Sequence, residues 1–417
     1  SAQRTHMHIV HFSDLHIGVE NYSHINPKTG LSNRLDDFVD SYNEVIDYAI
    51  NSQADLVIFA GDAYKNREPS QTHQKLFAKG LSRMAQEGIS VFLVPGNHDS
   101  PSVRGKASAL DIFDTLHIPG VTIGDRIKVY PLETKSGKIQ IISVPWVRRA
   151  EFLSRAPSSN NSIEELTSFI ETELTKLITE AQRNLDTSIP TILAGHLTVA
   201  GAITSSEVSM MLGRDHILLP SSLALDGIDY VALGHIHRAQ VINEIPPVVY
   251  SGSLQRVDFG EEKDTKGFYA IDIDSTAEPR HRVSHYEFHP VKARKFLTIP
   301  VTIDDSDQTP TETALTRIRQ YDVTGAITRL DISMPRHLES LFREQDVRVA
   351  LQDAHFIAPS KRQITGHRDT RWKGTHLNQQ NPIDTLKRYL DFREELSDSY
   401  RTSLITAAQT IIDEDSN

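Results

Sequence analysis

Residues 90–99 read SVFLVPGNHD, and this stretch contains the pattern on which the fold prediction rests. A short apolar run ends at a glycine, and an asparagine, a histidine and an aspartate follow directly. Continuous hydrophobic runs of this length are typical of strands that are buried on both faces. Glycine lets the backbone turn sharply where such a strand ends. We therefore expect a buried strand here whose end presents chemically capable side chains.

Runs of the same kind recur along the chain. They lie at 8–13, 55–61, 139–145, 189–195 and 228–234. Between them, residues 36–50 and 163–182 have apolar side chains at three- and four-residue steps, which predicts helices. Strands that alternate with helices indicate a layered α/β domain. Two later runs, 248–253 and 267–273, have no helix between them and are predicted to add strands to a sheet.

Metal-capable side chains follow five of the six predicted strands. They are Asp14 and His16; Asp62; Asn97, His98 and Asp99; His196; and His235 and His237. In open α/β sheets, ligands bind at the carboxyl edge of the strands, where these residues lie. In Asp14-x-His16 and His235-x-His237, an extended backbone would place both side chains on one face. One such motif alone is usually a turn or a structural histidine, but five in order favour a common site.

The composition limits the chemistry of this site. Cysteine is absent, so disulfides, thiolate ligands and thiol catalysis are excluded. Histidine, aspartate and asparagine donors suit Mn²⁺, Fe²⁺ or Zn²⁺. Asp62 could place one oxygen on each of two ions, and paired ions of this kind clamp an in-line phosphoryl displacement. Other histidines, such as His73, His117 and His216, are predicted to be structural.

The charge balance argues against a broad nucleic-acid surface. The chain of 417 residues has 44 Lys and Arg against 55 Asp and Glu, a net charge of −11, whereas phosphate backbones attract cations. Two local segments, 280–295 and 360–376, each have five cationic residues against one acidic residue. Each fits a DNA contact or a solvated face equally well. The candidate DNA-binding residues are His24, Arg256, Arg280, Arg282, Lys292, Arg294, Arg368, Arg371, Trp372 and Lys373.

The chain is long enough for two to three domains. We expect a first domain over 7–279, a small domain of strands and helices over 287–357, a polar linker over 358–382 and a helix over 383–413. The amphipathic pattern of the last segment fits either packing on its own domain or binding of a partner, with Leu386, Leu390, Tyr400 and Leu404 as candidate contacts. The apolar runs of the chain are too short to span a membrane, and no secretory signal is predicted.

The motifs DLH, GD, GNHD, GH and GHIH, in this order, resemble those of the calcineurin-like metallophosphoesterases over about residues 1–275. HFSDLHIG (11–18), LGHIHR (233–238) and YSGSLQRVDFGEE (250–262) are similar to the SbcD/Mre-eleven family of DNA double-strand-break repair nucleases. The resemblance implies a four-layer α/β/β/α core, a small α+β capping domain and a C-terminal helical tail. It also implies a homodimer, a cytoplasmic location in a prokaryote, and a tail that binds an SbcC/Rad-fifty-type SMC-like ATPase.

The resemblance further implies roles for single residues. Asp14, His16, Asp62 and His237 would hold one metal ion, and Asp62, Asn97, His196 and His235 the second. His98 would protonate the leaving oxygen or steady the phosphate, and Asp99 would orient His98. The ions would be two Mn²⁺, with Fe, Zn or Mg as substitutes in vitro, and the activity 3′→5′ exonuclease and endonuclease on DNA. The alternatives are a phosphodiesterase or phosphatase for nucleotides or small molecules, and an inactive scaffold.

Overall fold

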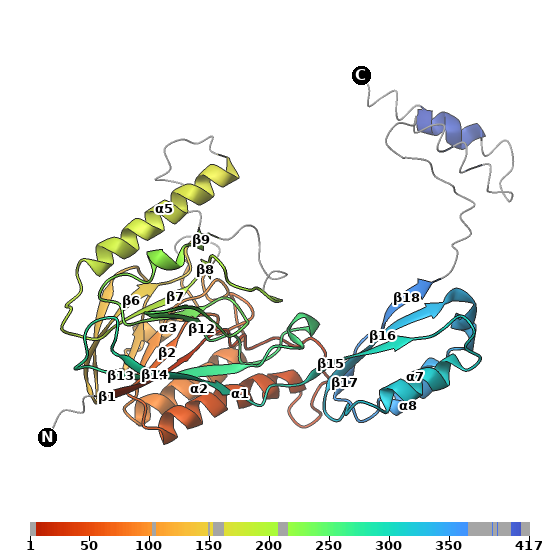
Figure 1. The fold of residues 1–417 in the computed structure, drawn as a ribbon, viewed down its shortest axis with the longest axis horizontal. Helices are drawn as coiled ribbons and strands as arrows, with labels where there is room; N and C mark the ends of the chain where they lie inside the picture. Colours follow the sequence, from red (N-terminus) through yellow and green to blue (C-terminus); the bar gives the residue numbers. More distant parts are fainter. Residues whose placement is uncertain are drawn as a thin grey trace. The chain divides into compact units, whose positions relative to one another are not determined.

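The structure is a computed structural model that describes residues 6–101, 106–148, 151–152, 162–206 and 216–365, together with 386, 390 and 402–409 (Figure 1). The chain divides into two units, residues 1–363 and 364–417. In the second unit, residues 402–409 are helical, and so are Leu386 and Leu390. None of the helices in the described ranges is both long enough and apolar enough to cross a bilayer.

The first six-stranded sheet follows the predicted runs closely. Its order is β14-β13-β1-β2-β3-β4. Strands β1 to β4 are parallel, and β13 and β14 extend the sheet by antiparallel pairing. The strands span β1 His6–Phe12, β2 Leu56–Phe59, β3 Ser90–Leu93, β4 Val121–Ile123, β13 Gly267–Asp274 and β14 Val283–Pro290.

The second six-stranded sheet has the order β11-β12-β10-β7-β6-β5. Its four inner strands are parallel, and β5 and β11 pair antiparallel at the two edges. The strands span β5 Val129–Thr134, β6 Gly137–Val144, β7 Thr191–His196, β10 Tyr230–Gly234, β11 Gln240–Glu244 and β12 Pro247–Tyr250. Each predicted run at 139–145, 189–195 and 228–234 is therefore a buried strand.

Helices cover the outer faces of both sheets (Figure 1). Helices α1 Asn33–Asn51, α2 Gln71–Gln86 and α3 Asp111–Thr115 share one apolar core with the first sheet. Helix α5 Ile163–Gln182 shares a second core with the other sheet, and it begins at the predicted residue because Ser162 and Glu165 form a capping box. A third core, with Ile58 and Ile192, lies between the sheets. The α/β/β/α layering is confirmed.

A smaller sheet with two helices follows the core. Strands β15 Phe296–Thr302, β16 Ile327–Pro335 and β17 Phe356–Ile357 are parallel neighbours, and β18 Lys361–Thr365 pairs with β16. The helices are α7 Pro310–Ile318 and α8 Glu344–Ala350. The boundaries differ from the predicted ones in two places. Residues 287–290 belong to β14 of the core, and residues 361–365 form β18 although a linker was predicted.

Residues 336–353 of this small domain do not form one continuous helix. The segment contains a 3₁₀ helix, Arg336–Leu341, and then α8. Phe342 separates them in an extended conformation, with φ −84° and ψ 117°. An extended residue cannot continue the helical hydrogen-bond ladder, so the amphipathic pattern is divided between two short elements.

Candidate metal centre

The predicted ligands from both sheets meet at one site. Asp14, His16, Asp62 and Asn97 follow β1, β2 and β3 of the first sheet, whereas His196, His235 and His237 come from the ends of β7 and β10 in the second. All of them are buried except Asn97, which is half-buried. The carboxyl ends of both parallel arrays thus face a common centre, as the order of the strands predicts.

One half of the centre is formed around His16. Its Nε2 lies 3.0 Å from Nε2 of His237, 3.9 Å from Oδ1 of Asp14 and 3.8 Å from Oδ2 of Asp62. These three neighbours offer one imidazole nitrogen and two carboxylate oxygens within reach of a single cation. Asp14, His16 and His237 accordingly form one of the groups in the described chain that could hold a metal ion.

The other half is formed around His196 and Asn97. Nε2 of His196 lies 3.3 Å from Oδ2 of Asp62 and 2.9 Å from Oδ1 of Asn97. The same Asn97 oxygen lies 3.2 Å from Nδ1 of His235. Oδ2 of Asp62 is therefore close to His16 on one side and to His196 on the other. This position between the two halves is the one expected of a bridging carboxylate.

The backbone at the ligands is unusual. Asp14, His16, Asp62 and His235 have φ values of 51°, 48°, 62° and 95°. Non-glycine residues rarely adopt this region, and clusters of such residues are typical of functional sites. The expectation that strand alternation aligns Asp14 with His16 is therefore wrong in its reasoning. The two side chains meet because both residues lie in left-handed turns after β1 has ended.

Two glycines leave the space that these turns need. A Cβ on Gly61 would lie 2.2 Å from Nδ1 of His196, and a Cβ on Gly96 would lie 2.1 Å from Oδ1 of Asp62. Gly61 also has φ +95°. Any side chain at either position would displace a candidate ligand, so glycine is required for close approach.

The outer nitrogens of two histidines are tied to the protein. Nδ1 of His196 donates to the backbone oxygen of Ala60 over 2.7 Å, and Nδ1 of His237 donates to Oε1 of Glu261 over 2.7 Å. Each bond fixes the tautomer in which Nε2 has its lone pair directed into the centre, as metal-binding histidines require. The donor set and its orientation therefore fit a divalent metal ion.

Glu261 belongs to a buried network that the sequence analysis did not assign. Its Oε2 accepts a hydrogen bond from Nζ of Lys266 over 2.8 Å. Lys266 in turn donates to the backbone oxygen of His237 and to Oγ of Ser253. Both charged side chains are fully buried. Glu261 lies within the quoted segment 250–262, but no local pattern indicates that it contacts His237.

The electrostatics of the centre reflect burial and opposite charges. Burial raises the pKa of Asp14, whereas Asp62 has a pKa well below its usual range because nearby imidazoles, His196 foremost, outweigh its burial. Burial alone would lower the pKa of His196 and of His237. The carboxylates of Asp62 and Glu261 outweigh it and raise each pKa to about 9. The centre is thus a buried set of mutually dependent charges.

His98 lies at the accessible side of the centre, but Asp99 does not orient it. Nδ1 of His98 donates to the backbone oxygen of Lys65 over 2.6 Å. The carboxylate of Asp99 instead accepts backbone N–H groups from Gly96, Asp62 and Ala63 at 2.8–3.0 Å. The predicted carboxylate–imidazole pair is therefore wrong. Asp99 holds the ends of β2 and β3 together, and burial raises its pKa to about 7.

Arg282 and Arg280, two of the predicted DNA-binding residues, lie at the opposite edge of the sheets. The buried Arg282 lies 3.3 Å from Asp229 and donates to the backbone oxygen of Thr187. Arg280 pairs with Asp226 at 3.0 Å. Asp229 and Thr187 precede the starts of β10 and β7, whereas the metal centre lies at the strands' ends. We correct the DNA-binding prediction for Arg282, whose charge is neutralised inside the fold. The exposed ion pair of Arg280 does not test its role, so for Arg280 DNA binding stays a prediction.

Arg256 and Arg294 also have internal partners. The Arg256 guanidinium donates to the backbone oxygens of residues 261, 264 and 294. Arg294 forms an ion pair with Asp37 and donates to the backbone oxygen of Gly325. These guanidinium groups connect loops around β15, so the prediction that they contact DNA is also corrected.

The remaining predicted contacts divide into described and undescribed residues. Lys292 and His24 are exposed, and the His24 ring lies 5.0 Å from that of Phe356 on β17. Arg368, Arg371, Trp372, Lys373 and Tyr400 lie outside the described residues. Of the other predicted partner contacts, Leu390 is buried, and Leu386 and Leu404 are half-buried.

Comparisons with known proteins agree with this geometry. The family model of the calcineurin-like phosphoesterases matches residues 7–239. The chain is 27% identical over 270 residues to the D component of the nuclease SbcCD from Bacillus subtilis (strain 168). This alignment covers 64% of this chain and 66% of that protein. The chain is also 25% identical over 300 residues to the DNA double-strand break repair protein Mre11 of Methanococcus maripaludis. This alignment covers 70% of this chain and 68% of that protein.

A solved structure, that of TT1561 from Thermus thermophilus, aligns with a TM-score of 0.36 at 12% identity. The alignment covers 68% of this chain and 98% of that one. Against the curated relatives named above, the chain spans about two thirds of their length.

Proposed function

We propose, from the premise that this chain belongs to the calcineurin-like phosphoesterase family, that it is a Mn²⁺-dependent DNA nuclease. As a member of that family, the chain is a metal-dependent phosphoester hydrolase. The proposed activity is 3′→5′ exonuclease and endonuclease cleavage in a double-strand-break repair complex. The observation that carries the proposal is the meeting of seven oxygen and nitrogen donors at the shared edge of two sheets. The nuclease and repair names of the relatives support DNA as the substrate.

Two ions are proposed for the two halves of the centre. Asp14, His16, Asp62 and His237 would hold one ion, and Asp62, Asn97, His196 and His235 the other. Support comes from Oδ2 of Asp62, which lies 3.8 Å from Nε2 of His16 and 3.3 Å from Nε2 of His196. Ions held there would supply Lewis-acid polarisation of a phosphodiester. The chain itself positions the donors, because the backbone N–H of His235 donates to both oxygens of Asp14.

His98 is proposed as the residue that protonates the leaving sugar oxygen. Its Nδ1 hydrogen bond to Lys65 leaves Nε2 to face the substrate, and its ring lies perpendicular to that of His16 at 5.1 Å. Its backbone N–H donates to Oδ1 of Asp62 over 2.8 Å. His98 is thus anchored beside the centre through its Nδ1 and its backbone N–H, yet it stays half-exposed, as a general acid must be.

The C-terminal region is proposed to serve partners. In this proposal the two six-stranded sheets and their helices form the nuclease domain, and strands β15 to β18 with α7 and α8 form a capping domain. The residues after β18 link it to the tail, and the helix over 383–413 binds an SMC-like ATPase. The name of the Bacillus relative, one component of a larger nuclease, supports such an assembly. Co-purification with the ATPase, before and after truncation at Asn381, tests it. A complex that persists without the tail contradicts it.

The proposed function is tested by one pair of assays. Labelled linear duplex DNA and a small phosphodiester are each incubated with the full chain and Mn²⁺, and His98→Ala is the matched control. DNA degradation that the variant loses supports the nuclease. Turnover of the small ester alone indicates a phosphodiesterase for small molecules, and no turnover of either substrate indicates a scaffold; both outcomes overturn the proposal.

A further inference from the structure

His11 is a fully buried histidine that the proposed function does not use. It belongs to β1, three residues before Asp14, and it lies on the same face of the strand as Ile9, which is part of the core between the sheets. Its ring reaches across to β10 of the other sheet. Nδ1 lies 3.1 Å from the hydroxyl oxygen of Tyr230, and Nε2 lies 3.2 Å from the backbone oxygen of Leu233. The imidazole therefore joins a strand of one sheet to a strand of the other.

Both hydrogen bonds of His11 fit a neutral ring. A backbone oxygen can only accept, so Nε2 donates to Leu233, and the lone pair of Nδ1 accepts from the Tyr230 hydroxyl. Burial lowers the pKa of His11 to about 3 and raises the pKa of Tyr230 well above its usual range, so both groups keep these protons at neutral pH. A buried polar contact that is fully satisfied makes a packed core more rigid and more specific. The contact therefore fixes how β1 lies against β10.

Beyond His11 the two strands lead directly into one half of the metal centre. Residues after β1 then meet residues at the end of β10 in the same order: Ser13 with Gly234, Asp14 with His235, and His16 with His237. A Cβ on Gly234 would lie 2.7 Å from that of Ser13, so the chains approach closely. The hydrogen bond to Asp14 is 3.0 Å long, and the two histidine nitrogens lie 3.0 Å apart. A shift of β1 along β10 would therefore displace each of these pairs.

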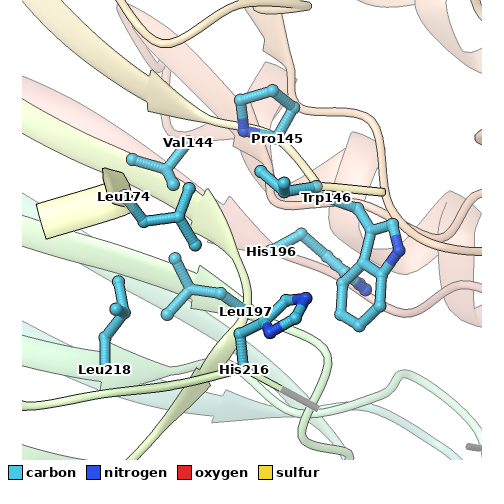
Figure 2. A pocket seen from close by; sticks show the side chains of 9 residues that line it. Val144, Pro145, Trp146, Leu174, His196, Leu197, His216 and Leu218 are labelled. Atoms are coloured by element: carbon cyan, nitrogen blue, oxygen red, sulfur yellow. The ribbon is translucent and has the colours of Figure 1, made fainter. Parts of the chain in front are cut away.

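The other half of the centre has supports of its own. His196 is the last residue of β7, and its Nδ1 donates to the backbone oxygen of Ala60, after β2, over 2.7 Å. Figure 2 shows its ring beside that of Trp146, with which it lines a small apolar hollow. The backbone N–H of Trp146 donates to the backbone oxygen of Pro95, after β3. These contacts connect β2 and β3 to the second sheet without the participation of His11.

We propose that His11 is a positioning residue, which sets the register of β1 against β10 and thereby holds together the ligands of the first ion, the one around His16. This role rests on the proposed two-ion centre and deepens it by assigning a separate support to one ion. Three of the four ligands proposed for the first ion, Asp14, His16 and His237, follow β1 or β10. Of the ligands of the second ion, only His235 does, and β10 pairs directly with β7, which presents the other imidazole. Loss of His11 should therefore weaken the first ion selectively.

Two ligand variants, each expected to leave one ion, test this asymmetry. His196→Ala removes a ligand of the second ion only, and His16→Ala removes a ligand of the first ion only. Mn²⁺ is titrated calorimetrically into the full chain with either variant, alone and in combination with His11→Leu. Electron paramagnetic resonance counts the bound Mn²⁺ and reports whether two ions are coupled. Both readouts are independent of catalytic activity.

The expected results differ between the two backgrounds. With His196→Ala, the addition of His11→Leu should weaken Mn²⁺ binding about tenfold, the lower end of the effect of groups that orient metal ligands. With His16→Ala, the same addition should change the affinity less than about twofold, which is below the effect of one hydrogen bond. His11→Gln should retain most of the affinity for the first ion, because an amide can donate to Leu233 and accept from Tyr230.

Two further variants separate positioning from general stability. Ile9→Ala removes apolar contacts from the same face of β1 but leaves the hydrogen bonds of His11 in place. It should lower the urea midpoint without selective loss of the first ion. Tyr230→Phe removes one of the two hydrogen bonds and should weaken the first ion about 2- to 10-fold. This variant decides the question if His11→Leu does not fold, and an unchanged affinity then overturns the role of His11.

Equal losses of affinity in the two backgrounds overturn the positioning role, since a merely structural residue would weaken both ions alike. No loss in either background also overturns it. Failure of the proposed function gives different results. Two ions retained by both ligand variants contradict the two-ion centre, and with it the role of His11, before His11 is changed. If DNA stays intact in the cleavage assay while the asymmetry persists, the nuclease proposal fails and the positioning role stands.

Discussion

Glu261→Gln offers a sharp test of how the protein maintains its metal centre. The substitution keeps the size of the side chain but removes its charge. Oε1 of Glu261 accepts from Nδ1 of His237 over 2.7 Å, and Oε2 accepts from Nζ of Lys266 over 2.8 Å and from the backbone N–H of Val257 over 3.1 Å. All of these contacts are buried, so water cannot replace the lost carboxylate.

Two effects of different size follow. The first concerns His237, whose basicity and orientation depend on the carboxylate. Loss of such a partner commonly weakens metal binding about 10- to 100-fold. The second concerns Lys266, which remains buried without its counter-charge. Breaking a buried ion pair on one side costs about 3–5 kcal/mol of unfolding free energy. The variant should therefore lose both metal affinity and stability.

A double variant separates the two effects. Glu261→Gln with Lys266→Met removes the unpaired charge, and neutral replacement of a buried ion pair often restores stability. We expect urea unfolding to show recovery of about 3–5 kcal/mol, whereas calorimetric Mn²⁺ titration should still show the roughly 10- to 100-fold loss. If the double variant binds Mn²⁺ as tightly as the unaltered chain, Glu261 does not act through His237 and the reasoning is refuted.

Three further predictions concern other residues. His98→Ala should lower turnover about 10²- to 10⁴-fold, as expected for a positioned acid, while calorimetry shows unchanged Mn²⁺ binding; lost binding would make His98 a ligand. Asp62→Ala should remove both ions, and two ions retained per chain in elemental analysis would contradict its bridging position. Arg282→Met should destabilise the fold by about 3–5 kcal/mol because it leaves the buried Asp229 unpaired. DNA affinity should stay the same, and a weaker affinity measured by fluorescence anisotropy would restore the original DNA-binding prediction.

The prediction from sequence succeeded for the buried strands and for the residues that follow them, because the local hydrophobic pattern and the direction of the strands are enough to identify both. Apolar runs identified six buried strands because each is short, continuous and bounded by turn-forming residues. Parallel strands end at one edge, so residues after them could be grouped without knowledge of any contact. His16 and His237 are separated by more than two hundred residues, and their nitrogens lie 3.0 Å apart. The place where the candidate metal ligands meet was therefore accessible from the sequence.

The prediction from sequence failed for arginines whose role depends on whether the side chain is buried or exposed. Arg256, Arg282 and Arg294 are basic residues in or near basic segments, and they were interpreted as a DNA surface. Their guanidinium groups are instead enclosed by backbone oxygens and carboxylates. A basic segment has the same composition whether its side chains point outward or inward. Exposure is decided by tertiary packing, which is why these interpretations were wrong.

The sequence by itself determined the α/β layering and which candidate ligands follow the ends of the strands, because periodicity and strand order are properties of the chain. Only the tertiary structure decided the partners of those donors. Asp99 binds backbone amides instead of its neighbour His98, and Glu261 supports His237. It also decided that Trp146 borders the centre beside an apolar hollow. These contacts join distant segments through side-chain directions that only folding sets, so no local pattern contains them.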